Sequence, residues 1–300
     1  MAKKVELIGL QLPEIVPEDD LPSILLDSIQ KEVGKLKEND ILVLTSKIVS
    51  KANNLLIKMD EIEISKKAIK ISKKTGVDVK YVQMILDHSD ELLIAIPLGD
   101  LVEEGTIDIG RLSDDSELAK VAMKKIPTPI FVRIGGQLYS NAGIDYSNHP
   151  KGIASYIPKN LDEYARKIRE KITQITNIDI GIVISDTEML PFGSLDLARG
   201  CSGVELMGKL FGEKDKYGNL KWGGAESYPN ELAIASGMVM GQIDAGIPAV
   251  LIRGMVIGKS EAGINSIWFE KQQLNGIIKK TVKKTIKVLG LRNLFRIFRS

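Results

Sequence analysis

The chain has 300 residues, of which 44% are hydrophobic and 27% charged, and its formal net charge at pH 7 is +2. These values allow one large domain or two smaller ones, and they exclude intrinsic disorder and a protein-wide electrostatic preference for nucleic acid. The single cysteine, Cys201, excludes an internal disulfide, and the two histidines are too few for a structural zinc site, so a bound metal should be a hard ion held by oxygen. We expect a cytoplasmic protein, because the sequence shows no charged, cleavable leader and no run of about 20 apolar residues.

The first predicted elements are a strand over residues 5–10, a helix over residues 20–33 and a strand over residues 41–44. Hydroxyl side chains and two lysines follow the second strand, in the run Thr45-Ser46-Lys47-Ile48-Val49-Ser50-Lys51. Ligand loops of open α/β sheets usually follow the carboxyl ends of strands, so this run could cradle a phosphate. An N-capped helix with solvated lysines explains the run equally well.

Residues 65–89 are interpreted as two short helices around Thr75-Gly76. The pattern resembles a DNA-reading helix-turn-helix, but its second half carries a single lysine, Lys80, so a packing module is the favoured interpretation. Residues 99–126 are a polar stretch with a short predicted helix, and their composition suggests a surface excursion before the next strand.

A polar stretch then follows a hairpin predicted over residues 130–140, with a Gly135-Gly136 turn. It reads Ser140-Asn141-Ala142-Gly143-Ile144-Asp145-Tyr146-Ser147-Asn148 and holds more side-chain oxygen than a connector needs. We interpret it as one wall of an active site, with Asp145 turned toward a ligand. The alternative is a turn that caps the next element.

The second half of the chain begins with an amphipathic helix over residues 161–175 and a strand over residues 178–184. This strand delivers Ser185-Asp186-Thr187 at its end. Residues 191–221 are glycine-rich and predicted to be irregular. A small-residue helix over residues 231–241 and a strand over residues 247–252 complete the main body.

Two carboxylates, Asp145 and Asp186, are thus each predicted to follow an apolar strand. Together with the Thr187 hydroxyl they suit Mg2+ or Mn2+, and Gln242 or Glu231 could complete the set. The alternative is that Asp186 caps a helix and Asp145 occupies a turn. The sequence contains no Gly-x-x-x-x-Gly-Lys-Ser/Thr phosphate loop and no Gly-x-Gly-x-x-Gly dinucleotide fingerprint.

Over most of residues 1–260 the chain resembles the coenzyme F-420 gamma-glutamyl ligase family. The matching stretches are Leu12-Pro13-Glu14-Ile15, Thr45-Ser46-Lys47-Ile48-Val49-Ser50-Lys51-Ala52, Val82-Gln83-Met84-Ile85-Leu86, Ser140-Asn141-Ala142-Gly143-Ile144-Asp145 with Ser147-Asn148, Ser185-Asp186-Thr187, Asp215 with Tyr217-Gly218, Asn230-Glu231-Leu232-Ala233, and Met240-Gly241-Gln242 through Gly246-Ile247-Pro248. Their order and spacing agree with the family as well as their content.

This resemblance implies an α+β fold, a mixed α/β arrangement in two parts without a P-loop or Rossmann motif, assembled as an intertwined homodimer. The reaction it implies joins L-glutamate through its amine to the free carboxylate of the deazaflavin's phospholactyl side chain, at the expense of GTP. Mg2+ or Mn2+ is the implied cofactor, K+ is a further candidate, and no nucleic acid partner is implied. Carried over by position, the metal ligands are Asp145, Asp186, Thr187 and Gln242. The nucleotide-binding residues are Pro13, Glu14, Ile15, Ser46, Lys47, Lys51, Asn148, Gly241 and Gly246, with Lys47 and Lys51 in catalytic roles.

The chain departs from the family pattern directly after Ser185-Asp186-Thr187. There the family has one residue, then Gly-Arg, Pro-Phe or Pro-Trp, and Arg, whereas this chain reads Glu188-Met189-Leu190-Pro191-Phe192-Gly193. Two arginines that could hold an anionic acceptor are therefore missing. The acceptor pocket is either rebuilt, with Arg199 as a candidate, or it serves a different acceptor. A non-catalytic paralogue that binds nucleotide or metal is the alternative function.

Charge is distributed unevenly between the main body and the C-terminal tail. Residues 271–300 hold nine Lys/Arg and no Asp/Glu, whereas residues 1–270 hold 32 basic and 39 acidic residues. We therefore predict a basic extension over residues 266–300, and the family resemblance implies a ligase-like unit over residues 1–265 with an insertion at residues 99–126.

Apolar residues recur at helical spacing within this extension, at Ile278, Val282, Ile286 and Leu289, with lysines between them. The pattern predicts an amphipathic basic helix. Docking of its apolar stripe on the main body or a dimer mate is the favoured interpretation, and adhesion to an anionic membrane surface is the alternative.

Overall fold

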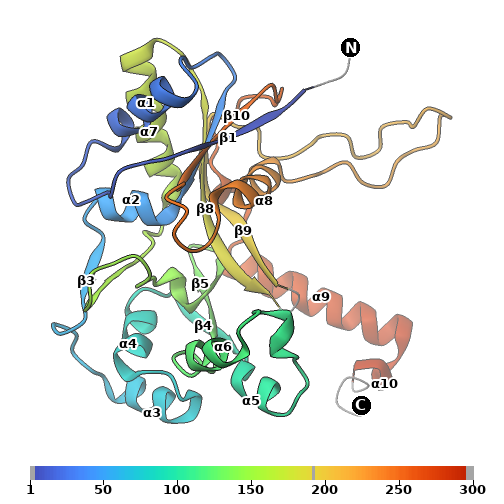
Figure 1. Ribbon diagram of the computed structural model, residues 1–300. Helices are drawn as coiled ribbons and strands as arrows, with labels where there is room; N and C mark the ends of the chain where they lie inside the picture. The colour runs from blue at the N-terminus through green and yellow to red at the C-terminus, as the bar shows by residue number, and fades with distance from the viewer. Residues whose placement is uncertain (1–3, 191–192, 295–300) are drawn as a thin grey trace. The chain divides into compact units, whose positions relative to one another are not determined.

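The computed structural model describes residues 4–190 and 193–294 of the chain. It divides into two compact units, Met1–Ser266 and Ile267–Ser300. The first unit combines helices with mixed and antiparallel sheets, which confirms the predicted α+β class (Figure 1).

A five-stranded sheet forms the centre of the first unit. Its strands, in spatial order, are β1 (Glu6–Leu10), β10 (Ala249–Arg253), β2 (Ile41–Thr45), β8 (Gly181–Leu190) and β9 (Gly193–Ser202). β2 and β8 are parallel, and the other neighbours are antiparallel. Since β1 and β2 are both antiparallel to β10, the strands β1, β2 and β8 run in the same direction and point to the same edge of the sheet.

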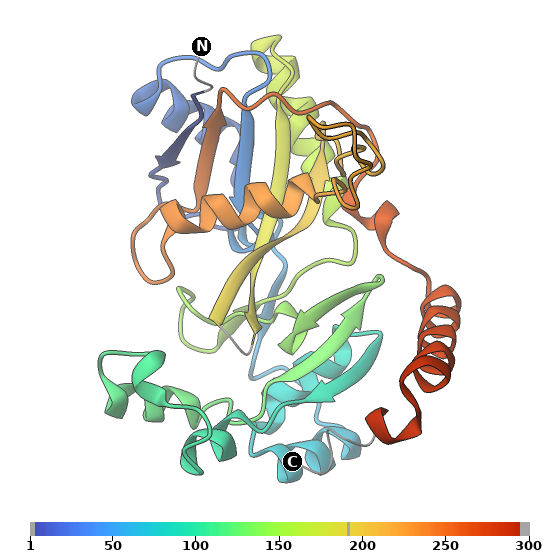
Figure 2. The ribbon, with the colours of Figure 1, turned by 90° about the vertical axis from the view of Figure 1, so that its right-hand side faces the viewer.

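Helices cover both faces of this sheet, as Figures 1 and 2 show together. On one face, α1 (Leu21–Glu32) packs against α7 (Leu161–Thr176), and α8 (Tyr228–Met240) crosses the other face. A strand that is covered on both sides needs apolar side chains at every position. Residues 41–44 of β2 and 249–252 of β10 are accordingly all buried, which is why continuous apolar runs predicted these strands.

Two smaller sheets and a group of helices lie below the central sheet in Figure 1. The elements are α2 (Ser46–Ala52), the β3 (Leu56–Lys58) and β7 (Ile153–Ser155) pair, α3 (Lys66–Thr75), α4 (Val79–Asp87), and the sheet of β4 (Glu91–Ala95), β5 (Ile130–Ile134) and β6 (Gln137–Ser140). The connection between β4 and β5 holds α5 (Leu98–Glu103), a 3-10 turn (Ile109–Arg111) and α6 (Ser116–Met123). The predicted hairpin is confirmed, because β5 and β6 pair across Gly135 and Gly136, which have φ of 58° and 102°.

Strands β8 and β9 differ from the prediction. β8 continues to Leu190 and pairs with β9, with a register shift between Ile184 and Ser185. The expectation of irregular structure from residue 191 is therefore wrong for β9, and Asp186 lies inside a strand rather than after it or at a helix cap. Backbone pairing needs no apolar side chain, so the polar and glycine-rich sequence of this ladder concealed it.

Beyond β9 the chain forms an extended arm over residues 207–227, drawn in gold at the right of Figure 1. Isolated bridges join Met207 to Ser227 and Lys214 to Leu220 across its two sides. At its end the Asp215 carboxylate accepts hydrogen bonds from the backbone N–H groups of residues 217 and 219, both at 2.9 Å. The arm is thus an irregular hairpin with an ordered tip.

The second unit is mostly helical. Its elements are α9 (Lys271–Leu289) and α10 (Leu291–Leu294), and a 3-10 turn (Ile264–Ile267) spans the boundary with the first unit. Glu270 and Gln273 form a reciprocal capping box at the start of α9. Within the described ranges, the structure contains no helix with the length and apolar character that a membrane crossing requires.

Candidate active site

The edge of the sheet at which β1, β2 and β8 point is hollowed by a cavity of about 760 Å³. Its lining comes from residues within 12–15, 45–51, 140–150, 185–187 and 240–248, together with Tyr81 and Asp196. The parallel pairing of β2 and β8 sets Thr45 beside Ser185. The residues that follow them, Ser46 and Asp186, are therefore neighbours. Segments far apart in the sequence meet here because β2 and β8 are paired in register, although β2 ends at Thr45 and β8 continues to Leu190.

The two lysines of α2 are held in ion pairs with the surrounding loops. Lys47 Nζ lies 2.9 Å from Asp145 Oδ2. Lys51 Nζ donates to Glu14 Oε1 at 2.5 Å and to the backbone oxygen of Asn148 at 2.7 Å. The lysine side chains are 23% and 9% exposed, so the segment is helical but the expectation of solvated lysines is wrong.

The polar stretch after β6 is a tightly built turn. The residues with positive φ in it are Asn141, Ala142, Gly143 and Asn148. A Cβ atom on Gly143 would lie 2.4 Å from Ile157 Cδ1, so glycine is required there for space as well as for its φ of 61°. The turn places Asp145 in the cavity lining, as predicted.

Asp186 faces the cavity from β8. Ser46 Oγ donates to its Oδ1 at 2.7 Å. Burial raises the pKa of Asp186 from its ordinary value of 3.8 to about 7, and the negative charge of Glu188 acts in the same direction. A cation beside Asp186 would stabilise its ionised form, so the electrostatics of this wall favour a positively charged ligand.

A third carboxylate, Asp196, lies behind Thr187 and Gln242. Thr187 Oγ1 donates to Asp196 Oδ1 at 2.5 Å and is 3.3 Å from Gln242 Oε1. Gln242 Nε2 donates to Asp196 Oδ2 at 3.4 Å. Sequence reasoning missed Asp196, because only the pairing of β8 with β9 sets it opposite Thr187.

The oxygen donors of the cavity suit a hard divalent ion. Among the described residues, no group of three or more His, Cys, Asp or Glu side chains could hold a metal ion by itself. The wall instead combines the carboxylates of Asp145 and Asp186 with hydroxyl and carboxamide oxygens. Such a set fits Mg2+ or Mn2+, which keep waters and take phosphate oxygens as further ligands, and it does not suit zinc.

All the residues that the family resemblance assigns to metal or nucleotide binding line this one cavity. They are Pro13, Glu14, Ile15, Ser46, Lys47, Lys51, Asp145, Asn148, Asp186, Thr187, Gly241, Gln242 and Gly246. Glu231, the further candidate, lies exposed in the first turn of α8 and is absent from the described lining. His149, which the sequence analysis did not select, also lines the cavity, and its Nε2 is buried without a hydrogen-bond partner among the described residues.

Arg199, the candidate for an acceptor-binding cation, lies beneath the site rather than in it. Its side chain is 1% exposed, forms an ion pair with Glu188 and stacks on the Tyr139 ring, with 4.0 Å from Cζ to the ring centroid. The suggestion that Arg199 rebuilds the acceptor pocket is therefore wrong, because its charge is already neutralised in the core. Met189 and Leu190 lie on β8, whereas Pro191 and Phe192 are outside the described residues.

Comparisons with known proteins cover the whole range of these segments. The sequence model of the F420-0:gamma-glutamyl ligase family matches residues 9–254, a range that contains every lining residue of the cavity. The coenzyme F420:L-glutamate ligase of Methanococcus maripaludis (strain C6) is 35% identical over 252 residues, which cover 83% of this chain and 88% of the relative.

Two further relatives carry the same name. That of Methanocaldococcus jannaschii is 33% identical over 255 residues, covering 84% of this chain and 88% of its own. That of Methanopyrus kandleri is 31% identical over 252 residues, covering 83% and 86%. The chain therefore belongs to the F420-0:gamma-glutamyl ligase family.

Proposed function

We propose that the chain is a GTP- and divalent-metal-dependent ligase that forms an amide between L-glutamate and an acceptor carboxylate. The proposed acceptor is the phospholactyl group of the coenzyme F-420 precursor, since the matched family and its named relatives act on F420. The observation that carries the proposal is the convergence of all the assigned metal and nucleotide residues on one cavity.

The proposed metal ligands are Asp145, Asp186, Thr187 and Gln242. A divalent ion bound there would neutralise charge on the triphosphate and orient it for transfer. The two carboxylates already balance the charge of a divalent ion, so further positive charge is needed beside the triphosphate.

Lys47 and Lys51 are suited to that requirement. Among the described residues that line the cavity, they are the only lysines or arginines. Their present partners, Asp145 and Glu14, belong to the walls of the same cavity, so a bound anion can share these ammonium groups without a change of fold. Fixed positive charge beside a moving phosphoryl group stabilises the transition state of its transfer.

The proposed reaction has two steps. The acceptor carboxylate attacks the γ-phosphorus of GTP, the bond to the β-γ bridging oxygen breaks, and GDP leaves. The glutamate amine then attacks the acyl carbon. The bond between this carbon and the bridging oxygen breaks, phosphate leaves with that oxygen, and the amine loses a proton.

The acceptor end of the cavity motivates a second candidate function. Leu190 and Gly193 occupy the positions of the two arginines expected after Thr187, and Met189, 40% exposed, occupies the position of the family's glycine. A binding protein that has kept nucleotide affinity without turnover is the alternative.

Thermal-shift titration with GTP, GDP and ATP, with and without Mn2+, tests the nucleotide site. We expect GTP with Mn2+ to raise the melting temperature, because a ligand that binds only the folded state stabilises it. No shift with any nucleotide well above physiological concentration would overturn the proposal.

Turnover then separates the ligase from the binder. With L-glutamate and the F420-0 acceptor, we expect release of GDP and a product heavier by one glutamyl residue. Lys47→Met should lower this rate by about 100-fold or more, and Lys159→Met, at a 70% exposed side chain paired with Asp90, is the matched control. Stabilisation by GTP without GDP release would support the binder.

A further inference from the structure

Helix α9 is divided lengthwise into a cationic half and an apolar half. With about 100° between successive residues, one half of the helix carries Lys279, Lys280, Lys283, Lys284 and Lys287. The other half carries Leu274, Ile277, Ile278, Thr281, Val282, Thr285, Ile286 and Val288. These two sets do not overlap around the axis, and Lys271, the first residue of the helix, is the one lysine of α9 on the apolar side.

The apolar half is exposed. No residue of α9, which the structure describes along its whole length, is buried. Ile278, Val282 and Ile286 are 51%, 39% and 38% exposed. The apolar surface covers about half of the circumference of the helix, so a large apolar area is left in contact with solvent.

The lysines repel one another along the helix. Lys279 and Lys283, Lys280 and Lys284, and Lys283 and Lys287 are each four residues apart, the spacing at which like charges destabilise a helix. Residues 271–300 contain no Asp or Glu that could compensate. The negative charge that would relieve this repulsion must therefore come from outside the segment.

We propose that α9 binds the surface of a membrane that contains anionic phospholipids. Helices with a lysine-rich face and an apolar face lie in the plane of the interface, with apolar side chains among the acyl chains and ammonium groups among the headgroups. A nucleic acid would use the lysines and leave the apolar half in water. A protein groove without acidic residues would use the apolar half and leave the lysine repulsion uncompensated, whereas an anionic lipid interface satisfies both halves.

Co-sedimentation of the full chain with lipid vesicles tests this proposal. Vesicles of phosphatidylcholine with about one third phosphatidylglycerol should bind the protein, and vesicles of pure phosphatidylcholine should bind it weakly. Raising the salt from about 0.1 M to about 0.5 M should weaken the binding, because screening shortens the reach of the headgroup charges.

Paired variants separate the contributions of the two halves. Each basic residue near an anionic surface raises the affinity about fivefold, so Lys283→Gln with Lys284→Gln should weaken binding about 25-fold. Lys66→Gln with Lys67→Gln removes the same charge from exposed positions on α3 and should have little effect. Ile278→Asn with Val282→Asn keeps the charge and should also abolish sedimentation with vesicles.

Three outcomes would overturn the proposal. The first is equal binding to both kinds of vesicle. The second is binding that depends on the lysines but not on Ile278 and Val282, which would indicate a site for soluble polyanions such as nucleic acid. The third is absence of vesicle binding together with a lower melting temperature of the Ile278→Asn, Val282→Asn protein, which would show that α9 docks on protein.

Discussion

A buried ion pair between Glu188 and Arg199 joins the two acidic segments of the site. Glu188 Oε2 accepts a hydrogen bond from the backbone N–H of Ser140, the first residue of the turn that carries Asp145, and Glu188 itself lies two residues after Asp186. Both charged side chains are almost fully buried, at 3% and 1% exposure. Glu188 therefore connects the strand that carries Asp186 to the turn that carries Asp145, and its ion pair with Arg199 holds this connection in the core.

Removing one partner of this pair should be costly. We expect Arg199→Met to lower the free energy of unfolding by about 3–5 kcal/mol, because Glu188 would remain buried without its counter-charge. Urea denaturation at pH 7 measures the difference. The double variant Glu188→Leu, Arg199→Met should recover most of the loss, since a well-packed apolar pair can replace a buried ion pair. A loss below about 1 kcal/mol in the single variant would contradict the buried-pair interpretation.

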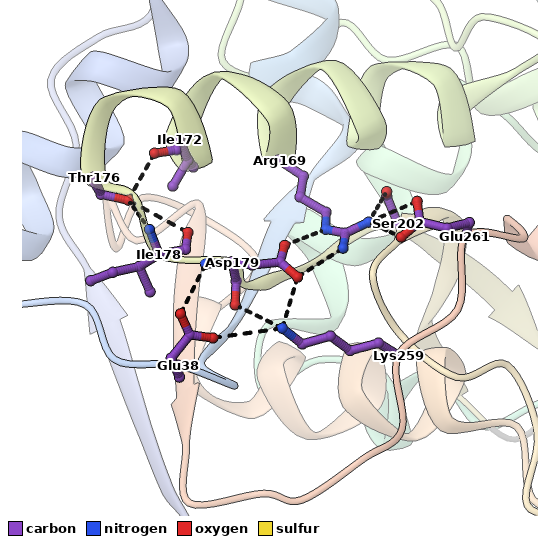
Figure 3. Close-up of polar contacts among 9 residues, drawn as sticks. All are labelled: Glu38, Arg169, Ile172, Thr176, Ile178, Asp179, Ser202, Lys259 and Glu261. Atoms are coloured by element: carbon purple, nitrogen blue, oxygen red, sulfur yellow. Dashed lines mark hydrogen bonds and ion pairs between the residues drawn. The ribbon is translucent and has the colours of Figure 1, made fainter.

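At the scale of secondary structure, a charged network anchors helix α7 to the central sheet (Figure 3). The Arg169 guanidinium donates to both oxygens of Asp179, at 2.8 and 3.0 Å, and also contacts Glu261 at 2.9 Å. Lys259 Nζ donates to Asp179 Oδ2 at 2.7 Å. A Cβ atom on Gly203 would lie 2.5 Å from Arg169 Nε, so a side chain there would displace the guanidinium.

This network should make stability depend on pH. Hydrogen bonds from Arg169 hold the pKa of Asp179 below its ordinary value, so the stabilisation is present above the unfolded pKa of about 3.9 and is lost as the pH falls through the folded value. Because Asp179 is 33% exposed, we expect Asp179→Asn to cost only about 1–2 kcal/mol at pH 7.

Denaturation of both proteins between pH 7 and about pH 3 checks this expectation. The gap between the original chain and Asp179→Asn should narrow as the pH falls below about 4. Asp114→Asn, at an exposed aspartate, is the control and should give no pH-dependent difference. A gap that stays constant with pH would show that the ionised carboxylate is not what stabilises the contact.

At the scale of the whole molecule, the arm over residues 207–227 presents large apolar side chains to solvent. Phe211 and Trp222 meet edge to face on it and are 59% and 90% exposed, and Leu220 is 74% exposed. Contiguous exposed surface of this kind is typical of interaction sites. We propose that a second copy of the chain covers it, which would produce the homodimer that the family resemblance implies.

Light scattering after size-exclusion chromatography tests the proposed dimer. Interface aromatics are typical hot spots worth about 2 kcal/mol or more, so Trp222→Ser should weaken dimerisation about 30-fold. Met238→Ser is the control, because Met238 is 88% exposed but lies on α8, away from the arm. A monomeric original chain, or equal effects of the two substitutions, would contradict the proposal.

The local sequence was sufficient to predict strands that consist of continuous apolar residues and turns that require glycine. The continuous apolar runs of β2 and β10 require cover on both faces, and the central sheet supplies it. Gly135 and Gly136 supply the positive φ that the β5–β6 hairpin needs. The segments around Lys47, Asp145 and Asp186 were selected by their content of oxygen and amine groups, whereas residues 12–15 and the glycines at 241 and 246 were selected only through the family resemblance.

Only the tertiary structure decided which of these groups face one another. Ser46 and Asp186 are 140 positions apart in the sequence, and their hydrogen bond exists because β2 and β8 are parallel neighbours. Asp196 enters the site through the β8–β9 register, and Arg199 leaves it by pairing with Glu188 in the core. Strand pairing and burial are long-range properties, and a residue's type does not reveal its partner across a sheet.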